Sequence, residues 1–87
     1  MPEISWFFGI KITMNWNDHV PPHFHAYYGS YEASISIKDC TVIAGALPRK
    51  ELNLVLAWCF MYQQELLENW DLSRNSRPLN KIPPLSK

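Results

Sequence analysis

Residues 23–37 read HFHAYYGSYEASISI, a pattern that predicts a β-hairpin of fixed register. Polar and apolar side chains alternate on both sides of Gly29 and Ser30, which is the period of a strand with one buried face. Two turn residues that begin with glycine favour a tight type II′ turn, although type I′ remains open. The register then matches apolar with apolar and polar with polar side chains. Its predicted pairs are Tyr28–Tyr31, Tyr27–Glu32, Ala26–Ala33, His25–Ser34, Phe24–Ile35 and His23–Ser36.

One long strand is expected before the hairpin, because every even position from Ile4 to Trp16 is apolar. Phe7 interrupts the polar side of this pattern, and Gly9 indicates a bulge or a close approach of another segment. The pattern stops before residues 21–22, a doubled proline that donates no ladder hydrogen bond and restricts the residue before it. This segment is therefore a connection.

The second half of the chain predicts a turn at residues 38–40, a fourth strand at 41–47 and then a helix. Pro48 suits the first turn of a helix, where its missing N–H needs no partner. An apolar stripe along the helix predicts packing on the sheet, and apolar residues outside the stripe predict contact with another surface, such as a second copy. The stripe comprises Leu52, Val55, Cys59, Tyr62, Leu66 and Trp70, while Leu54, Trp58 and Met61 lie outside it.

These patterns predict a single α+β domain over residues 1–87. We expect an antiparallel sheet of about four strands within residues 4–46, one long helix over about 48–71 packed on one face, and an extended C-terminal tail over 73–87. The expected core includes Phe8, Ile10, Ile12, Phe24, Ala33, Ile35, Val55, Cys59, Tyr62 and Leu66.

Composition narrows the functional classes. The net charge is zero, so no global field attracts nucleic acid or an anionic membrane, although every charged side chain after Asp71 is basic. The two cysteines are expected to be reduced and structural. The N-terminus lacks the features of a secretory signal, and the longest apolar run, 54–62, is about half of what a membrane span requires. We therefore expect a cytoplasmic protein without a membrane partner.

The segments MPEISxFFG, NDHxPPHFHAxYGxYEA, LPxR, ELLENW and PLxKIxPL resemble a family of small bacterial proteins called domain of unknown function 4160. The resemblance covers essentially the whole chain. It implies a toxin-like component of a toxin–antitoxin-type gene pair, with a cognate small antitoxin-like protein as partner and a role in growth control. Two positions depart from the family pattern: Val20 stands where proline is common, and Cys40 stands where glycine is common.

The histidines of residues 18–25, DHVPPHFH, carry the main chemical signal. Because His23 and His25 are separated by one strand residue, their side chains leave the same face, with Cα atoms about 7 Å apart. Three uses compete: a zinc site that includes His19, acid–base cleavage of RNA by two imidazoles, and a polar sheet face that binds a partner without catalysis. The stiff prolines are expected to carry His19 away from the other two, which argues against a tightly bound metal and predicts no cofactor.

The catalytic hypothesis is a ribonuclease with His23 and His25 as the acid–base pair and with their side chains off the core. Its alternative is a non-enzymatic regulatory module that binds a protein partner or nucleic acid. The candidate catalytic residues are His23, His25, Tyr27 and Glu32, and the candidate substrate-binding residues are His19, Arg49 and Lys50.

Overall fold

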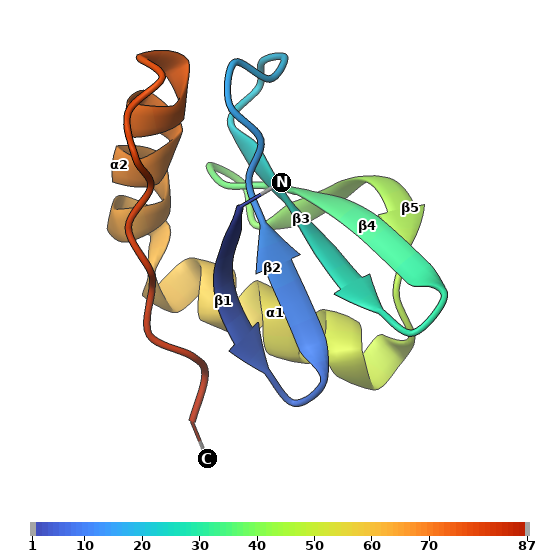
Figure 1. The fold of residues 1–87 in the computed structure, drawn as a ribbon. Helices are drawn as coiled ribbons and strands as arrows, with labels where there is room; N and C mark the ends of the chain where they lie inside the picture. The colour runs from blue at the N-terminus through green and yellow to red at the C-terminus, as the bar shows by residue number, and fades with distance from the viewer. Residues whose placement is uncertain (1, 87) are drawn as a thin grey trace.

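A computed structural model describes residues 2–86 and shows an α+β fold. Five strands form one antiparallel sheet in the order β1-β2-β3-β4-β5, and two helices follow (Figure 1). The α+β class and the antiparallel sheet are confirmed, but the sheet has five strands where about four were predicted, and two helices replace the single long one. The elements are β1 Glu3–Phe7, β2 Ile10–Thr13, β3 His23–Tyr28, β4 Tyr31–Ser36, β5 Thr41–Ala46, α1 Arg49–Met61 and α2 Gln63–Arg74.

The β3–β4 hairpin has the predicted register at all six pairs, from Tyr28 opposite Tyr31 to His23 opposite Ser36. Its turn has a positive φ of 57° at Gly29 and none at Ser30, which fits the type II′ alternative. Local alternation and a two-residue turn were therefore enough to fix this part of the sheet.

The predicted long first strand is instead a second hairpin, formed by β1 and β2. Phe8 and Gly9 both have positive φ, 51° and 78°, and reverse the chain in a two-residue turn. The turn resets the alternation, so Phe7 is buried while Phe8 and Trp6 are 44% and 52% exposed. Phe7, rather than the predicted Phe8, belongs to the core, and Gly9 was the sequence signal for the reversal.

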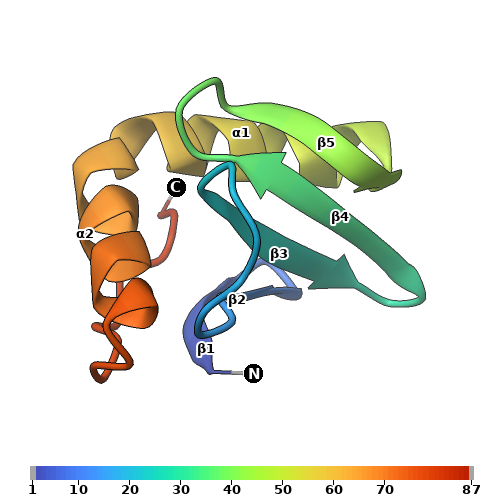
Figure 2. The same cartoon turned by 90° about the horizontal axis from the view of Figure 1, so that it is seen from above.

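The predicted single helix is divided at Tyr62, whose φ of −118° departs from helical geometry. Next to this break, the side-chain amide of Gln63 donates to the carbonyl oxygens of Ile37 and Lys38 after β4, at 2.9 and 3.1 Å. These bonds hold the junction against the sheet. Figures 1 and 2 show α1 lying across one face of the sheet and α2 turning sharply from the direction of α1.

The core lies between α1 and the sheet and is centred on Trp58, a residue predicted to lie outside the helix stripe. The Trp58 ring is fully buried, with centroids 5.2 Å from Phe7 and 5.5 Å from Phe24. The remaining predicted core residues are buried, except that Tyr62 is only partly buried. The buried apolar set is Ile4, Phe7, Ile10, Ile12, Met14, Phe24, Ala26, Ala33, Ile35, Ile37, Leu47, Val55, Trp58, Cys59, Leu66, Trp70 and Ile82.

The tail after α2 is extended, as predicted, but it packs against the fold. Trp58 donates its indole N–H to the carbonyl oxygen of Pro83 at 2.8 Å, and the Asn69 side chain bonds both the N–H and the carbonyl of Asn80. Ile82 is buried beside β1. Neither helix in the described part of the chain is long and apolar enough to cross a membrane.

Candidate functional site

His23 and His25 lie on the same face of β3, as the alternation predicted. Their rings meet edge to face with centroids 5.1 Å apart. Phe24, between them in sequence, points to the opposite face and packs against α1 through Trp58. The two imidazoles therefore form a pair on the sheet face opposite the contact between Phe24 and Trp58.

A carboxylate from the β2–β3 connection joins this pair. One oxygen of Asp18, Oδ2, lies 3.1 Å from Nε2 of His23 and 3.3 Å from Nε2 of His25. The Asn15 side-chain amide donates to the same oxygen at 3.3 Å. The other oxygen, Oδ1, accepts the backbone N–H of His19 at 2.8 Å. Asp18, His23 and His25 form what we call the Asp–His cluster.

His23 is buried, which corrects the prediction that both histidines lie off the core. Its ring centroid is 5.4 Å from that of Trp70, because α2 turns back over this end of β3. The side chains of His23, His25 and Asp18 are only 10%, 14% and 18% exposed. Replacing His23 by alanine would therefore remove its contact with the Trp70 ring as well as its imidazole nitrogens.

The hydrogen bond at Nδ1 of His23 fixes which ring nitrogen carries the proton when the ring is neutral. Nδ1 lies 2.8 Å from the carbonyl oxygen of Pro21, which only accepts, so Nδ1 carries a proton. In a neutral ring Nε2 would then direct a lone pair at the carboxylate of Asp18. In that tautomer the 3.1 Å approach brings two hydrogen-bond acceptors together, so a cation at this point would be favourable.

His25 has partners at both ring nitrogens. Nδ1 lies 3.2 Å from the hydroxyl of Ser34, its predicted cross-strand partner, and Nε2 lies between Asp18 and the Asn15 amide, 3.4 Å from the latter. Because a hydroxyl both donates and accepts, Ser34 accommodates either protonation state of Nδ1.

The electrostatics of the cluster favour an ionised Asp18. Burial alone would raise the pKa of its carboxyl, but the backbone N–H of His19, the hydrogen bonds from His25 and Asn15 and the charge of His23 outweigh burial and lower it below 3.8. The carboxylate is therefore available near neutral pH as a hydrogen-bond acceptor or a ligand.

An open hollow of about 420 Å³ lies at Asp18, and a cation from α2 borders it. Arg74 donates from Nη1 to the Asp18 carbonyl oxygen at 3.3 Å, with its guanidinium 6.0 Å from the ring centroid of Trp70. The lining residues are Asn17, Asp18, His19, Val20 and Arg74. Arg74 was assigned by sequence only to the basic C-terminal segment, so its place at the site was missed.

Tyr27 and Glu32 are the other predicted catalytic residues, and they lie opposite each other on β3 and β4. Tyr27 is two residues after His25, so its side chain is on the same face of the sheet. Burial, and next the negative charge of Glu32, raise the pKa of the Tyr27 phenol above 10. The Lys11 ammonium lies 5.3 Å from the centroid of the Tyr27 ring. These two residues extend the polar face but are not members of the Asp–His cluster.

The three predicted substrate-binding residues do not join the imidazoles. His19 is exposed, and it reaches the cluster only through its backbone N–H. Arg49 and Lys50 are the first residues of α1, which follows β5. The last residue of β5, Ala46, pairs with Glu32 near the β3–β4 turn. Arg49 and Lys50 are therefore at the opposite end of β3 from His23. Arg74 supplies the cation that the sequence had assigned to them.

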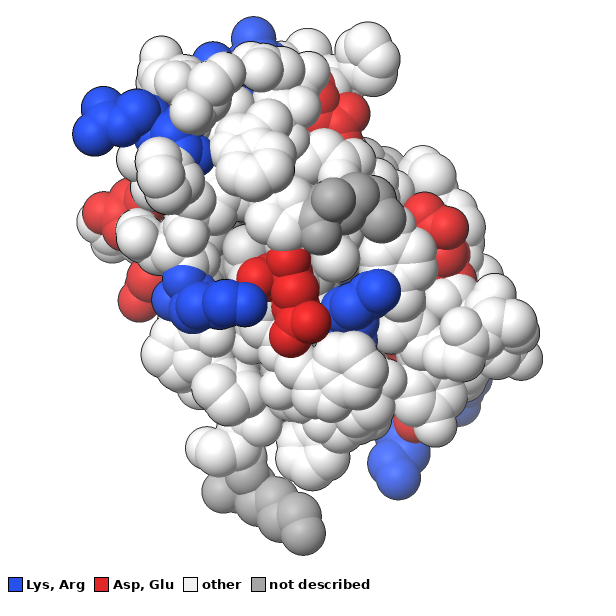
Figure 3. Space-filling view, in the orientation of Figure 1, with Lys and Arg blue, Asp and Glu red and all other residues white. Residues whose placement is uncertain are grey.

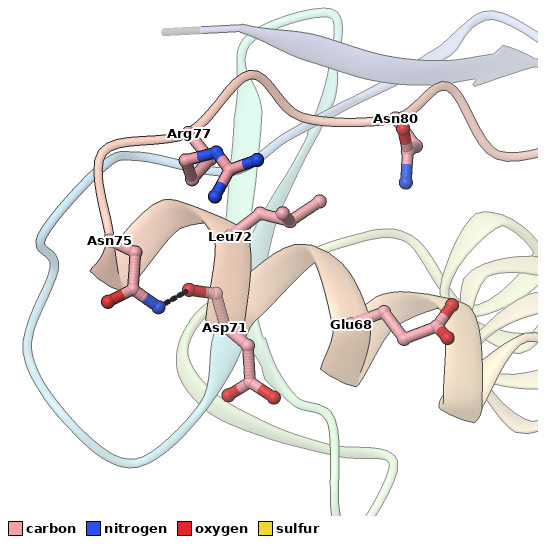
Figure 4. Close-up of a pocket in the computed structure, with 6 residues that line it drawn as sticks. All are labelled: Glu68, Asp71, Leu72, Asn75, Arg77 and Asn80. Atoms are coloured by element: carbon pink, nitrogen blue, oxygen red, sulfur yellow. Dashed lines mark hydrogen bonds between the residues drawn. The ribbon is translucent and has the colours of Figure 1, made fainter.

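A second hollow, also about 420 Å³, lies between α2 and the tail (Figure 4). Its polar side chains include Glu68, Asp71 and Arg77. Within it the Asn75 side-chain amide donates to the Asp71 carbonyl oxygen at 2.9 Å, which gives this carbonyl at the end of α2 a hydrogen-bond partner. It contains no histidine or cysteine, so the candidate site is the hollow beside the Asp–His cluster.

Comparison with known proteins gives one match. The model of the family "Domain of unknown function (DUF4160)" matches residues 9–71. The chain belongs to this family. No curated protein and no solved structure matches the chain. The DUF4160 match includes Asp18, His23 and His25 but ends before Arg74, so the cluster lies within the shared region and its neighbouring cation lies outside it.

Proposed function

We propose that this DUF4160 protein is the toxin-like component of a bacterial toxin–antitoxin-type pair, and that it inhibits growth in the cytoplasm by cleaving RNA. The observation that carries the proposal is the Asp–His cluster beside Arg74. Cleavage of a phosphodiester needs a group that accepts a proton and a cation that offsets the phosphate charge. Asp18 of the cluster and Arg74 both line the same hollow.

The geometry of the Asp–His cluster changes the predicted catalytic roles of His23 and His25. His23 and His25 both direct Nε2 at one carboxylate oxygen, so they cannot act as a separate acid and base on opposite sides of a phosphate. We assign the three side chains to one proton-transfer centre, which takes the proton of the attacking ribose 2′-hydroxyl and returns it to the 5′-oxygen that leaves as the P–O5′ bond breaks. Asp18 orients the imidazoles, and the Pro21 carbonyl fixes the ring of His23.

Arg74 is the phosphate-contacting group in this proposal. A guanidinium matches phosphate geometry through several N–H donors. On the face drawn in Figure 3, Lys and Arg side chains are scattered among Asp and Glu without a continuous basic band. A local contact at the site therefore fits better than wide electrostatic binding of nucleic acid.

The test combines growth and cleavage assays with matched variants. His25→Gln, which keeps a polar side chain of similar length, should lower the cleavage of single-stranded RNA by about 100-fold or more and relieve growth inhibition. Arg74→Ala should weaken RNA binding, whereas Arg49→Ala, which removes a cation far from the cluster, should change neither. Circular dichroism checks folding. Cleavage by His25→Gln at the wild-type rate would remove the cluster from the mechanism.

A non-enzymatic binding module is the second candidate, and a separate surface favours it. Phe60 and Met61 at the end of α1 are 72% and 59% exposed, and the whole of β5 is exposed. A cognate small antitoxin-like protein would cover such apolar groups. Titration with the purified product of the adjacent gene tests this candidate: binding that Phe60→Ser abolishes, together with an absence of RNA cleavage, would favour it over the enzyme.

A further inference from the structure

We propose that the Asp–His cluster is a binding site for one divalent transition-metal ion of the zinc class, held by Nε2 of His23, Nε2 of His25 and Oδ2 of Asp18. One candidate ligand atom from each residue lies within 4.8 Å of the others. Two imidazoles and one carboxylate are a ligand set that zinc and related divalent ions use in catalytic sites.

The distances within the cluster suit one shared ion. Ligand atoms at 2.0–2.1 Å from a tetrahedral zinc ion are separated by about 3.3 Å. The two nitrogen–oxygen distances in the cluster, to Oδ2 of Asp18, are 3.1 Å for His23 and 3.3 Å for His25. Both nitrogen–oxygen pairs are thus already at the spacing that one shared ion requires.

The hydrogen bond between Nδ1 of His23 and the Pro21 carbonyl oxygen supports the same conclusion. The Nδ1 proton is fixed by the Pro21 carbonyl oxygen, so a neutral His23 presents an unprotonated Nε2 to the cluster. That nitrogen is a ready metal ligand, and a cation placed there removes the lone-pair repulsion with Asp18. A side chain only 10% exposed is a costly place for an unpaired charge or an unsatisfied lone pair.

The outer partners of the three ligands match those of metal sites. Metal-binding histidines usually hydrogen-bond a carbonyl, carboxylate or water through the second ring nitrogen. Here His23 donates to a backbone carbonyl, while His25 contacts the hydroxyl of Ser34. The other carboxylate oxygen of Asp18, Oδ1, accepts a hydrogen bond from the backbone N–H of His19. Each proposed ligand side chain is thus held in position by a hydrogen bond at an atom that does not face the ion.

Three protein ligands leave a coordination position for water or substrate, as in catalytic zinc sites. The hollow beside the cluster is lined by Asp18 and bordered by Arg74. The catalytic meaning of the ion rests on the proposed function, because a bound water of lowered pKa would supply the base for RNA cleavage. Binding of the ion does not depend on that function.

Cobalt titration of protein purified without a histidine tag and treated with chelator tests the site. Wild type is expected to bind one Co²⁺ per chain with visible absorption bands of a nitrogen- and oxygen-ligated ion, and Zn²⁺ should displace it and raise the melting temperature. His25→Gln and Asp18→Asn should lose the bands and the thermal shift, whereas His19→Gln, a matched histidine control, should keep both.

The outcomes separate the two proposals. Absence of the bands in wild type, or their survival in both ligand variants, would overturn the metal site. RNA cleavage that persists in chelator, without metal, would also overturn the ion's catalytic role while leaving the proposed function standing. Stoichiometric binding without any RNA cleavage would retain the site and remove the ribonuclease. Ser34→Ala, which removes only an outer partner, should weaken Co²⁺ binding by about 10-fold to 100-fold.

Discussion

The backbone N–H of Ile82 donates a hydrogen bond of 2.8 Å to the carbonyl oxygen of Ile4, which fastens the C-terminal segment to the first strand. Beside this bond, the Lys81 ammonium donates to the carbonyl oxygen of Glu3 at 2.7 Å. The side chain of Ile82 is only 4% exposed. The tail is therefore part of the structure rather than a solvated arm.

Ile82→Ala should destabilise the protein by about 2–5 kcal/mol, because it empties a buried site that the sheet and helices enclose. Ile43→Ala makes the same chemical change on the exposed strand β5 and should alter stability by less than about 0.5 kcal/mol. Urea unfolding followed by tryptophan fluorescence measures both. Equal effects of the two substitutions would show that the tail does not contribute to the folded core.

Gly45→Ala should be strongly destabilising, whereas Gly29→Ala should cost much less. Both glycines have positive φ, 74° and 57°, so an added side chain is strained in either place, by about 1–2 kcal/mol. At Gly45 the new Cβ would also collide with the carbonyl oxygen of Glu32, whereas Gly29 has open space around it. Thermal unfolding compares the variants, and similar melting temperatures would contradict the close approach of β4 and β5.

Asp18 should contribute stability that disappears in acid. Its folded-state pKa lies below the ordinary value, so its contribution is fully present above the unfolded pKa, near 3.9, and is lost as the pH falls through the folded pKa. The difference in unfolding free energy between wild type and Asp18→Asn should therefore be larger at about pH 5 than below about pH 3. Urea unfolding with chelator present measures it, and Asp71→Asn on exposed helix surface is the control. A difference that does not change with pH would contradict the lowered pKa.

Cys40 and Cys59 should form an intramolecular disulfide under a mild thiol oxidant such as diamide. Their sulfur atoms are 3.1 Å apart, linking the turn after β4 to α1. Burial, and next the hydrogen bond with Cys40, raise the pKa of the Cys59 thiol, so oxidation should be slow at neutral pH and faster in alkali. Mass spectrometry should show the loss of two hydrogens, and the Cys40→Gly variant should show none. Two thiols that remain titratable after oxidation and denaturation would disprove the pairing.

Cys40 lies in a turn at a position whose backbone geometry favours glycine. Cys40 has a φ of 52°, in the left-handed region that favours glycine, and glycine is the residue that the family pattern places there. Its thiol occupies the space beside Cys59 that a glycine would leave. The turn expected at residues 38–40 is thus present, with a backbone geometry that glycine adopts more easily than cysteine.

The β3–β4 hairpin, its register and the shared face of His23 and His25 all followed from the order of the residues. These features are local: a period of two and a two-residue turn define which side chains lie opposite one another. The pairing of His25 with Ser34 followed from the same count.

Tertiary structure decided which apolar side chains are covered and which polar groups meet the histidines. Periodicity records that a face is apolar, but not which segment covers it, so the roles of Phe7 and Trp58 depended on the turn at Gly9 and on the placement of α1. Arg74 reaches the Asp18 carbonyl across 56 residues of sequence, because the helix breaks after Met61 and α2 turns back over the end of β3. Such contacts are set by packing between distant segments, which is why the sequence supplied the histidine pair and only the folded chain assembled the Asp–His cluster with its neighbouring cation.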